Sequence, residues 1–422
     1  MPRDEAQIGP GVNKPLAEGN KGRVLIRTLL RPWWLNYGGM LQAWALQQVL
    51  NDLGYFSAVD TSRSDISTLK LDSRYLAMNL AMRILPAQLV PRRFHRKIAL
   101  QASEALAMNF SRNNIVTVRL YSWRRQPRSR VVGRYDAFIV GSDQVWRPGM
   151  ADVPSYLMDF LSDRDSRERI AYAASFGSDN PAGYDESMIQ YTRPLANRMT
   201  AISVREKSGV DLCASFWGVE AVRLPDPTLL LRKERYLALA FSDVSNDRPG
   251  DDLVSYILDP TIDTDQIVKR AAAVIGRDPS ILLPSVPDSI SEFRANRKKY
   301  MRPTTEKWLQ AFANSRYVIT DSFHGCVFSI IFERPFLVIP NHARGFTRFD
   351  SLLDVYGLRN RMVGSVNEVD RLFEPIDWNK VKSVLEAERE RGLIFLSSAL
   401  NSAEHKSTTI GQNAPKRLRG SI

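Results

Sequence analysis

One stretch decides the fold: Val318-Ile319-Thr320-Asp321-Ser322-Phe323-His324-Gly325-Cys326-Val327. An apolar run suited to a buried strand leads into a polar turn, and an apolar helix follows the turn. The pattern recurs upstream, where Ala137-Phe138-Ile139-Val140 ends at Gly141-Ser142-Asp143. Buried strands that run into polar turns and then helices are typical of parallel sheets in α/β proteins.

Working outward from these stretches, strands and helices alternate in two sets. The first set has strands expected over 24–29, 56–59, 137–140, 169–174 and 201–204, with a helix over 40–53. The second has strands over 253–258, 317–320 and 335–339, a helix from Asp265 and a last helix over 378–398. Two such sets predict two Rossmann-like domains that face each other across a cleft.

The expected domain organisation has four parts. Residues 1–22 and 401–422 are rich in polar and charged residues and are expected to be disordered tails, the second of them basic. Residues 23–205 form the first Rossmann-like domain, which carries a basic helical insert over 75–134. Residues 206–400 form the second domain, which is expected to bind the donor substrate.

Composition restricts the class of protein. Only two cysteines occur among 422 residues, Cys213 and Cys326, so neither a disulfide framework nor a zinc site is indicated. The N-terminus is charged and no apolar core follows it, as a secretory signal would require. No apolar run approaches the roughly 18 residues that span a bilayer. We therefore expect a cytoplasmic protein.

Much of the net charge of +12 lies in one segment. Residues 83–134 hold 12 Lys and Arg but a single acidic residue, Glu104. Such a segment suits the anionic surface of a membrane, so peripheral contact with the inner face of the cytoplasmic membrane is one expectation. A solvated helical face explains the same charges. Nucleic acid is not expected as a partner, because no module that binds it is recognisable.

Two polar segments in the first half are candidate ligand sites. In Asn36-Tyr37-Gly38-Gly39-Met40-Leu41-Gln42, paired glycines allow close approach of a ligand, and the following helix N-terminus favours an anion. A tight turn would use glycine equally well. In Gly141-Ser142-Asp143-Gln144-Val145-Trp146, the polar side chains suit sugar hydroxyls and the indole suits stacking. Helix capping and a tryptophan in the core are the alternative.

Two further segments carry charge at strand ends. Arg205 follows the strand over 201–204 and either pairs with Glu206 or binds a carboxylate or phosphate. Around Ser322 and Gly325, backbone N–H groups at a helix start would face an anion. His324 stands there as a candidate general acid, although a structural histidine is the alternative. Arg344 and Arg348 add positive charge after the next strand, or solvate a loop.

Taken in order, these segments resemble the polysaccharide pyruvyl transferase family over roughly residues 24–375. The matching pieces are Asn36-Tyr37-Gly38-Gly39, Asp136 to Trp146, Ile202 to Glu206, Asp226-Pro227-Thr228-Leu229-Leu230, Trp308-Leu309, Thr320 to Gly325, Arg348 to Leu353 and Gly357-Leu358. The resemblance implies an architecture similar to the GT-B glycosyltransferases. It also implies phosphoenolpyruvate as donor, a saccharide acceptor that is lipid-linked in one version of the hypothesis, and no cofactor.

By motif, Arg205 and His324 match donor-site positions of the family. The other roles are expectations from the residue types. His324 is expected as the general acid and Asp143 as a base or orienting group. Donor contacts are expected from Arg205, Ser322, Gly325, Arg344 and Arg348, and acceptor contacts from Asn36, Gly38, Gly39, Gln42, Gln144 and Trp146. One position departs from the family pattern, because many members have an arginine where this chain has Ser322. Arg344 or Arg348 is expected to supply the missing charge.

Three readings of function follow. The first is transfer of a pyruvyl group to a saccharide, with no required metal, since Asp263-Thr264-Asp265 stands at an expected helix start where capping explains it. The second is a glycosyltransferase of the same architecture that uses a nucleotide sugar. The third is a non-catalytic protein that binds polyanions or membranes through the basic segment.

Overall fold

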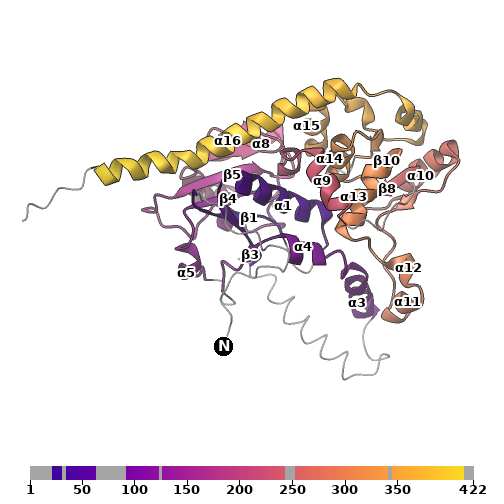
Figure 1. Cartoon of the computed structure of the whole chain (residues 1–422), viewed down its shortest axis with the longest axis horizontal. Helices are drawn as coiled ribbons and strands as arrows, with labels where there is room; N and C mark the ends of the chain where they lie inside the picture. The colour runs from indigo at the N-terminus through magenta and orange to yellow at the C-terminus, as the bar shows by residue number, and fades with distance from the viewer. Residues whose placement is uncertain are drawn as a thin grey trace, which may run out of the picture.

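The computed structural model describes residues 21–30, 35–62, 92–122, 126–242, 252–340 and 345–412. Two parallel β-sheets form its framework, one of seven strands and one of four. The sheets lie side by side with helices around them, and a long C-terminal helix runs across both (Figure 1). The predicted α/β class with two facing Rossmann-like sheets is confirmed.

The first sheet has the strand order β3-β2-β1-β4-β5-β6-β7. Its strands are β1 (Arg23–Arg27), β2 (Phe56–Asp60), β3 (Thr117–Val118), β4 (Ala137–Val140), β5 (Glu168–Ala174), β6 (Ala201–Val204) and β7 (Val222–Arg223). All neighbours pair in parallel, with Val24 opposite Ser57 on one side and Ala137 on the other. The strand order reverses direction at β1 and β4, so their carboxyl ends open a crevice of the kind that binds ligands.

The second sheet has the order β11-β10-β8-β9, again parallel throughout. Its strands are β8 (Leu253–Tyr256), β9 (Ser280–Ile281), β10 (Tyr317–Thr320) and β11 (Phe336–Val338). All eight strands expected from the sequence exist, within two residues of the expected bounds. The short edge strands β3, β7 and β9 have two residues each and were not expected.

Helices fill the connections. In the first part they are α1 (Tyr37–Asp52), α3 (Arg92–Glu104), α4 (Asn109–Asn114), α5 (Ser129–Val132), α6 (Val153–Tyr156), α7 (Glu186–Ala196), α8 (Lys207–Leu212), η2 (Cys213–Trp217), η3 (Pro227–Leu229) and α9 (Lys233–Ala240). In the second they are α10 (Ile262–Ile275), α11 (Ile290–Ala295), α12 (Arg297–Tyr300), α13 (Thr305–Asn314), α14 (Phe323–Ile331), α15 (Phe346–Tyr356), η5 (Arg359–Arg361), η6 (Val366–Phe373) and α16 (Trp378–Gln412). Asp263 and Asp265 lie in the first turn of α10, whose cap is Thr261.

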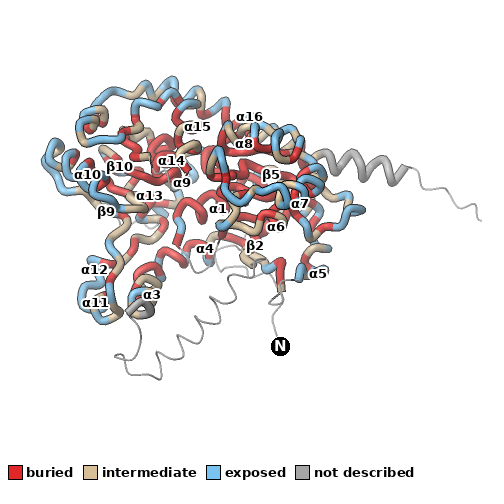
Figure 2. The backbone as a smooth tube through the Cα atoms, turned by 180° about the vertical axis from the view of Figure 1, so that it is seen from behind, coloured by how far each residue is buried: buried red, intermediate tan, exposed pale blue. Residues whose placement is uncertain are grey.

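Helix α1 joins the two sheets through a shared aromatic core. Trp44 packs on Tyr236 of α9 with ring centroids 5.7 Å apart, and Tyr37 stacks on Trp308 of α13 at 5.4 Å. One continuous apolar cluster contains buried residues from both sheets, including Val24 and Val318. Figure 2 shows this buried interior, with exposure confined largely to outer helices such as α10 and α11. The core therefore fixes the two sheets relative to each other.

The basic insert expected over 75–134 is only partly an insert. Its residues 75–91 and 123–125 lie outside the described residues. Helix α3 packs beside α11 and α12 of the second half, where Ala99 meets Phe293 and Tyr300 (Figure 1). Strand β3 completes the edge of the first sheet, so this part of the segment is integral to the first domain. Contact with a membrane through this segment stays a prediction.

Two expected boundaries need correction. Strand β7 pairs with β6, so the first domain continues to Arg223 rather than ending at 205. Helix α16 crosses back to the first sheet, where Phe395 lies 6.1 Å from Tyr172 of β5. It also runs to Gln412, past the boundary expected at 400. Residues 1–20 and 413–422 lie outside the described residues, and the prediction of disorder there is untested.

In the described ranges, no helix has both the length and the apolar character that crossing a membrane needs.

Candidate active site

A pocket of about 910 Å³ lies between the two sheets. It is at the upper end of the volumes found for small-molecule sites. Asn36, Tyr37 and Asp143 line it from the first sheet's side, and His324 and Arg348 line it from the second. Asp143 follows the carboxyl end of β4 and His324 follows that of β10, as the sequence predicted.

A buried carboxylate, Asp226, lies next to this pocket and connects its parts. One oxygen accepts hydrogen bonds from the backbone N–H and the hydroxyl of Thr228, at 3.1 and 2.7 Å. The other accepts from Ser142 Oγ at 2.9 Å and from Arg205 at 3.0 Å. Burial alone would raise the pKa of Asp226, but His324 and Arg205 hold it well below its usual range. Asp226 is therefore an anion inside the protein.

Arg205 is buried between two carboxylates. Its second guanidinium nitrogen lies 3.4 Å from Asp143, and the guanidinium carbon stacks 4.4 Å from the ring centre of Phe323. Burial alone would lower the pKa of Arg205, but Asp143 and Asp226 raise it. Arg205 is not among the side chains that line the pocket. The structure thus places this expected donor ligand behind the pocket wall, where it holds the two carboxylates.

Glu206 does not form the surface ion pair with Arg205 that the sequence left open. One carboxylate oxygen accepts from Ser175 Oγ at 3.0 Å and from the backbone of Phe176 and Gly177 at 2.8 and 3.2 Å. The loop that it holds meets Gly345, where an added Cβ would lie 1.8 Å from the Gly177 carbonyl oxygen. Gly345 precedes α15, so Glu206 indirectly fixes the helix that carries Arg348.

His324 lies in the first turn of α14 and is 7% exposed. Its Nε2 is buried and faces Asp226 Oδ2 at 3.6 Å, an ion-pair distance when the ring is protonated. Against the other ring nitrogen lies Gly38 of α1, where an added Cβ would be 2.0 Å from Nδ1. Gly38 is needed because only a residue without a side chain leaves room for this imidazole.

Arg348 reaches the pocket from α15. Its guanidinium lies 5.7 Å from the ring centre of Phe323, the ring on which Arg205 also stacks. Burial and the nearby Arg205 lower the pKa of Arg348 to about 9, so it is a cation at neutral pH. Arg344, the other arginine expected to replace the family's missing one, lies outside the described residues.

Asp143 has a backbone that few side chains adopt. Its φ is +75°, in the left-handed region that aspartate tolerates better than most residues. Its carbonyl oxygen accepts from the N–H groups of Val145 and Ser175, at 2.8 and 3.0 Å. This turn presents the carboxylate to the pocket, where the sequence expected it.

The start of α14 is an N-cap first and an anion site second. Ser322 Oγ accepts from the Gly325 N–H at 3.4 Å, and the Ser322 N–H donates to Thr320 Oγ1 at 3.0 Å. These groups are therefore already used, contrary to the direct contacts expected from Ser322 and Gly325. Within the described part of the chain, no hydrogen bond uses the N–H groups of Phe323 and His324. Those two remain to meet an anion.

Part of the expected acceptor site is wrong. Trp146 is fully buried, donates to the Tyr156 carbonyl at 3.4 Å and packs on Trp217, so it cannot stack on a sugar. Gln42 is also fully buried, and its amide groups are used within the protein. It donates to Thr28 Oγ1 and to the Gly39 carbonyl, and it accepts from the Ser142 N–H.

The other expected acceptor residues lie nearer the pocket. Asn36 and Gln144 line it. The Asn36 oxygen caps α1 by accepting from Gly39, and Gln144 accepts from Arg147 at 2.7 Å. An added Cβ at Gly39 would lie 2.6 Å from the Asn36 side chain, so this glycine serves the cap. Gly38 serves the imidazole rather than a sugar.

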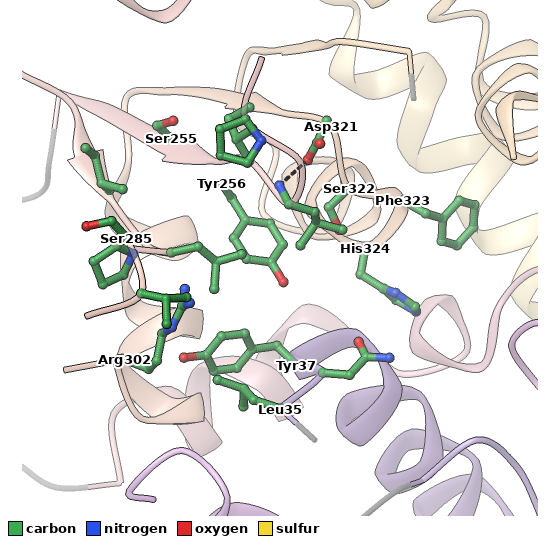
Figure 3. Close-up of a pocket in the computed structure, with 18 of the residues that line it drawn as sticks. Leu35, Tyr37, Ser255, Tyr256, Ser285, Arg302, Asp321, Ser322, Phe323 and His324 are labelled. Atoms are coloured by element: carbon green, nitrogen blue, oxygen red, sulfur yellow. Dashed lines mark hydrogen bonds between the residues drawn. The ribbon is translucent and has the colours of Figure 1, made fainter. Parts of the chain in front are cut away.

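Sequence reasoning missed several residues of the site. Asp226 was noted only as part of the Asp226-Pro227-Thr228 motif, although an acidic residue after a strand was a usable signal. No sequence pattern indicated that Tyr37, Tyr256, Glu104 and Arg302 line the same pocket. Asp321 proved structural, because it accepts from the Leu258 N–H at 2.5 Å (the dashed line in Figure 3) and from the Asp259 N–H at 2.9 Å.

Among the residues that the structure describes, no group of three or more His, Cys, Asp or Glu side chains is placed to hold a metal ion. That the reaction needs no metal stays a prediction.

Comparison with known proteins gives a family and a set of structural neighbours. The family model described as polysaccharide pyruvyl transferase matches residues 36–343. No curated protein matched. Solved structures with similarity include Staphylococcus aureus MnaA with UDP, at 11% identity and a TM-score of 0.41 over 95% of this chain and 99% of that one. The UDP-GlcNAc 2-epimerase of Neisseria meningitidis has 10% identity and a TM-score of 0.41, over 93% of this chain and 99% of that one. The calicheamicin glycosyltransferase CalG4 has 12% identity and a TM-score of 0.34, over 93% of this chain and 99% of that one.

Proposed function

This chain belongs to the polysaccharide pyruvyl transferase family, and from that premise we propose that it transfers the pyruvyl group of phosphoenolpyruvate to a saccharide of a cell-surface or exopolysaccharide as a ketal. The observation that carries the proposal is the pairing of His324 with Asp226 beside the interdomain pocket. His324 is the proposed general acid, and the buried carboxylate of Asp226 faces its Nε2 at 3.6 Å.

The donor has two anionic groups, and the pocket offers matching partners. Arg348 provides a guanidinium fork for a carboxylate or phosphate. The unused N–H groups of Phe323 and His324 at the start of α14 suit an anionic oxygen. Arg205 acts as a positioning residue behind Phe323, where its guanidinium holds the carboxylates of Asp143 and Asp226 in place. Arg348 thus supplies the charge that an arginine often provides at the position of Ser322 in the family.

The chemistry balances without any redox step. His324 gives a proton to the methylene carbon of phosphoenolpyruvate, which becomes the methyl group and leaves the adjacent carbon oxocarbenium-like. One sugar hydroxyl adds there and loses its proton, for which Asp143 is the placed base. The carbon–oxygen bond to phosphate then breaks, and a second hydroxyl adds and loses its proton. Two carbon–oxygen bonds to the sugar form, while the carbon–carbon double bond and the carbon–oxygen bond to phosphate are lost. One hydroxyl proton reprotonates His324, which replaces the proton now on the methyl group, and the other leaves on inorganic phosphate.

The geometry of His324 sets a requirement on this scheme. Its Nε2 is buried against Asp226. Proton delivery therefore requires either Nδ1 or a turn of the ring as the donor enters. Gly38 leaves no room for displacement toward α1, so the turn has to be toward the pocket.

The test measures release of inorganic phosphate from phosphoenolpyruvate with purified protein and a panel of saccharides. His324→Ala is expected to lower kcat by about 10²–10⁴-fold. His95→Ala is the control, because His95 lies on α3 and does not line the pocket. An unchanged rate in the His324 variant refutes its role. Release of a nucleotide from a nucleotide sugar, with no use of phosphoenolpyruvate, would establish the glycosyltransferase reading instead.

A further inference from the structure

The pocket extends well beyond His324. Figure 3 shows His324 at one end and Arg302 at the other, with the rings of Tyr37 and Tyr256 between them. Glu104 of α3 also lines this second end. A three-carbon donor bound near His324 and Arg348 fills only a fraction of about 910 Å³. The remainder is available to a larger molecule.

Arg302 is an unusual side chain to find in this position. It is 8% exposed, and its Nε atom has no hydrogen-bond partner among the described residues. The charge of Glu104 opposes the effect of burial on the pKa of Arg302, but among the described residues no carboxylate forms an ion pair with it. A buried guanidinium without a direct carboxylate partner is costly to maintain unless a ligand pairs with it.

The segment that carries Arg302 is held from two sides. The Arg302 N–H donates to the Ser103 carbonyl of α3 at 3.0 Å. The Tyr37 hydroxyl donates to the Pro303 carbonyl at 2.6 Å. Helices α3 and α1 of the first domain therefore fix the backbone on either side of this guanidinium. Such preorganisation lowers the entropic cost of binding.

The neighbouring acid does not neutralise the site. Burial raises the pKa of Glu104 to about 7, against the opposing effect of Arg302. At and below neutral pH a large share of this carboxyl is protonated, so it donates a hydrogen bond rather than repelling an anion. The faces of Tyr37 and Tyr256 add apolar surface beside it, as sugar rings require.

We propose that the end of the pocket around Arg302 binds the anionic group of an acidic acceptor saccharide, a sugar that carries a carboxylate or a phosphate. This rests on the proposed function, because it makes the Arg302 end the acceptor subsite and the His324 end the donor subsite. The planar guanidinium suits both groups by bidentate hydrogen bonding. It also relocates the acceptor from Gln42 and Trp146, which are buried elsewhere.

The test compares binding of three disaccharides that differ only in one terminal sugar: glucose, glucuronic acid and glucose 6-phosphate. Binding is measured by calorimetry at constant ionic strength, with wild type, Arg302→Gln, Arg302→Lys and Arg270→Gln. Arg270 is an exposed arginine of α10 whose replacement removes the same charge outside the pocket. Phosphoenolpyruvate binding is measured on every variant as a check that the donor end is folded.

Wild type and Arg270→Gln are expected to bind at least one anionic sugar about tenfold or more tightly than the neutral one, as charge-assisted hydrogen bonds contribute. Arg302→Gln is expected to lose that preference and Arg302→Lys to keep part of it, both with unchanged donor binding. The sugar that is preferred separates carboxylate from phosphate. Equal binding of all three sugars, binding of none, or a preference that survives Arg302→Gln overturns the proposal. If wild type does not bind phosphoenolpyruvate, the result counts against the proposed function instead. The comparison of the three disaccharides then still decides whether the Arg302 end binds an anionic sugar.

Discussion

Replacing Asp226 by asparagine removes a single charge from the centre of the site. The side chain keeps its shape, so the bond from the Thr228 N–H to the remaining oxygen survives. Arg205 loses its 3.0 Å ionic partner, and His324 loses the carboxylate 3.6 Å from Nε2. Leaving one member of a buried ion pair uncompensated costs about 3–5 kcal/mol. Because Arg205 retains Asp143 at 3.4 Å, we expect the lower end, about 3 kcal/mol.

The pH dependence of this loss has a definite sign. The pKa of Asp226 is held well below its usual range in the folded protein. A depressed carboxyl pKa contributes stability that is complete above the unfolded pKa of about 4 and is lost as the pH falls further. The difference between wild type and Asp226→Asn is therefore expected to be full at pH 7 and to shrink below about pH 4.

Urea unfolding at pH 7 and at lower pH measures this difference, and phosphate release measures activity. Activity is expected to fall about 10²-fold or more, because His324, the proposed general acid, loses the carboxylate that faces its Nε2 at 3.6 Å. Asp185→Asn is the matched control: it removes a charge from the N-cap of α7, a position that asparagine fills equally well. A stability loss that does not change with pH, or normal turnover in the Asp226 variant, would refute the reasoning.

Three further changes test separate parts of the structure. Gly38→Ala places a Cβ 2.0 Å from His324 Nδ1, so it is expected to lower kcat at least about tenfold although alanine favours helices. The control is Gly364→Ala, where the nearest atom to an added Cβ is 3.9 Å away. Equal activity of the two variants would contradict the packing of His324 on Gly38. Glu104→Gln removes a carboxyl whose pKa is raised to about 7. A raised carboxyl pKa stabilises the fold only at low pH, so between pH 5 and pH 8 the free energy of unfolding of wild type should fall by about 3 kcal/mol relative to that of the variant. Urea titrations measure this, and parallel stability curves for the two proteins would contradict it. Trp146→Phe is expected to cost about 1–3 kcal/mol of stability through lost packing on Trp217, while the KM for the saccharide stays constant. A raised KM at unchanged stability would instead support the sugar contact that the sequence predicted for Trp146.

The sequence predicted the sheets well because buried parallel strands leave a strong local signal. Ala137–Val140, Ala201–Val204 and Tyr317–Thr320 were placed to the residue, since each apolar run ends at a polar turn. The same rule located Asp143 and His324 at one pocket. The two-residue strands β7 and β9 have no such signal, because their pairing depends on neighbours far along the chain.

Partners at long range explain the errors in the site. Gln42 has the polarity of a sugar ligand, but its bonds go to Thr28, Gly39 and Ser142, and only the fold reveals that they enclose it. Asp226 meets Arg205 and His324 across two domains, a contact that no local spacing encodes. Arg302 was indistinguishable from other arginines until its burial in the pocket was known.

The most direct measurement of the central claim follows one reaction by two products. Wild-type protein is incubated with phosphoenolpyruvate and an acceptor saccharide, inorganic phosphate is quantified, and the saccharide is examined by mass spectrometry and NMR for a pyruvate ketal. The account predicts equal amounts of phosphate and ketal, and loss of both in His324→Ala. Phosphate release without ketal formation, or a ketal formed at the wild-type rate by His324→Ala, would contradict it.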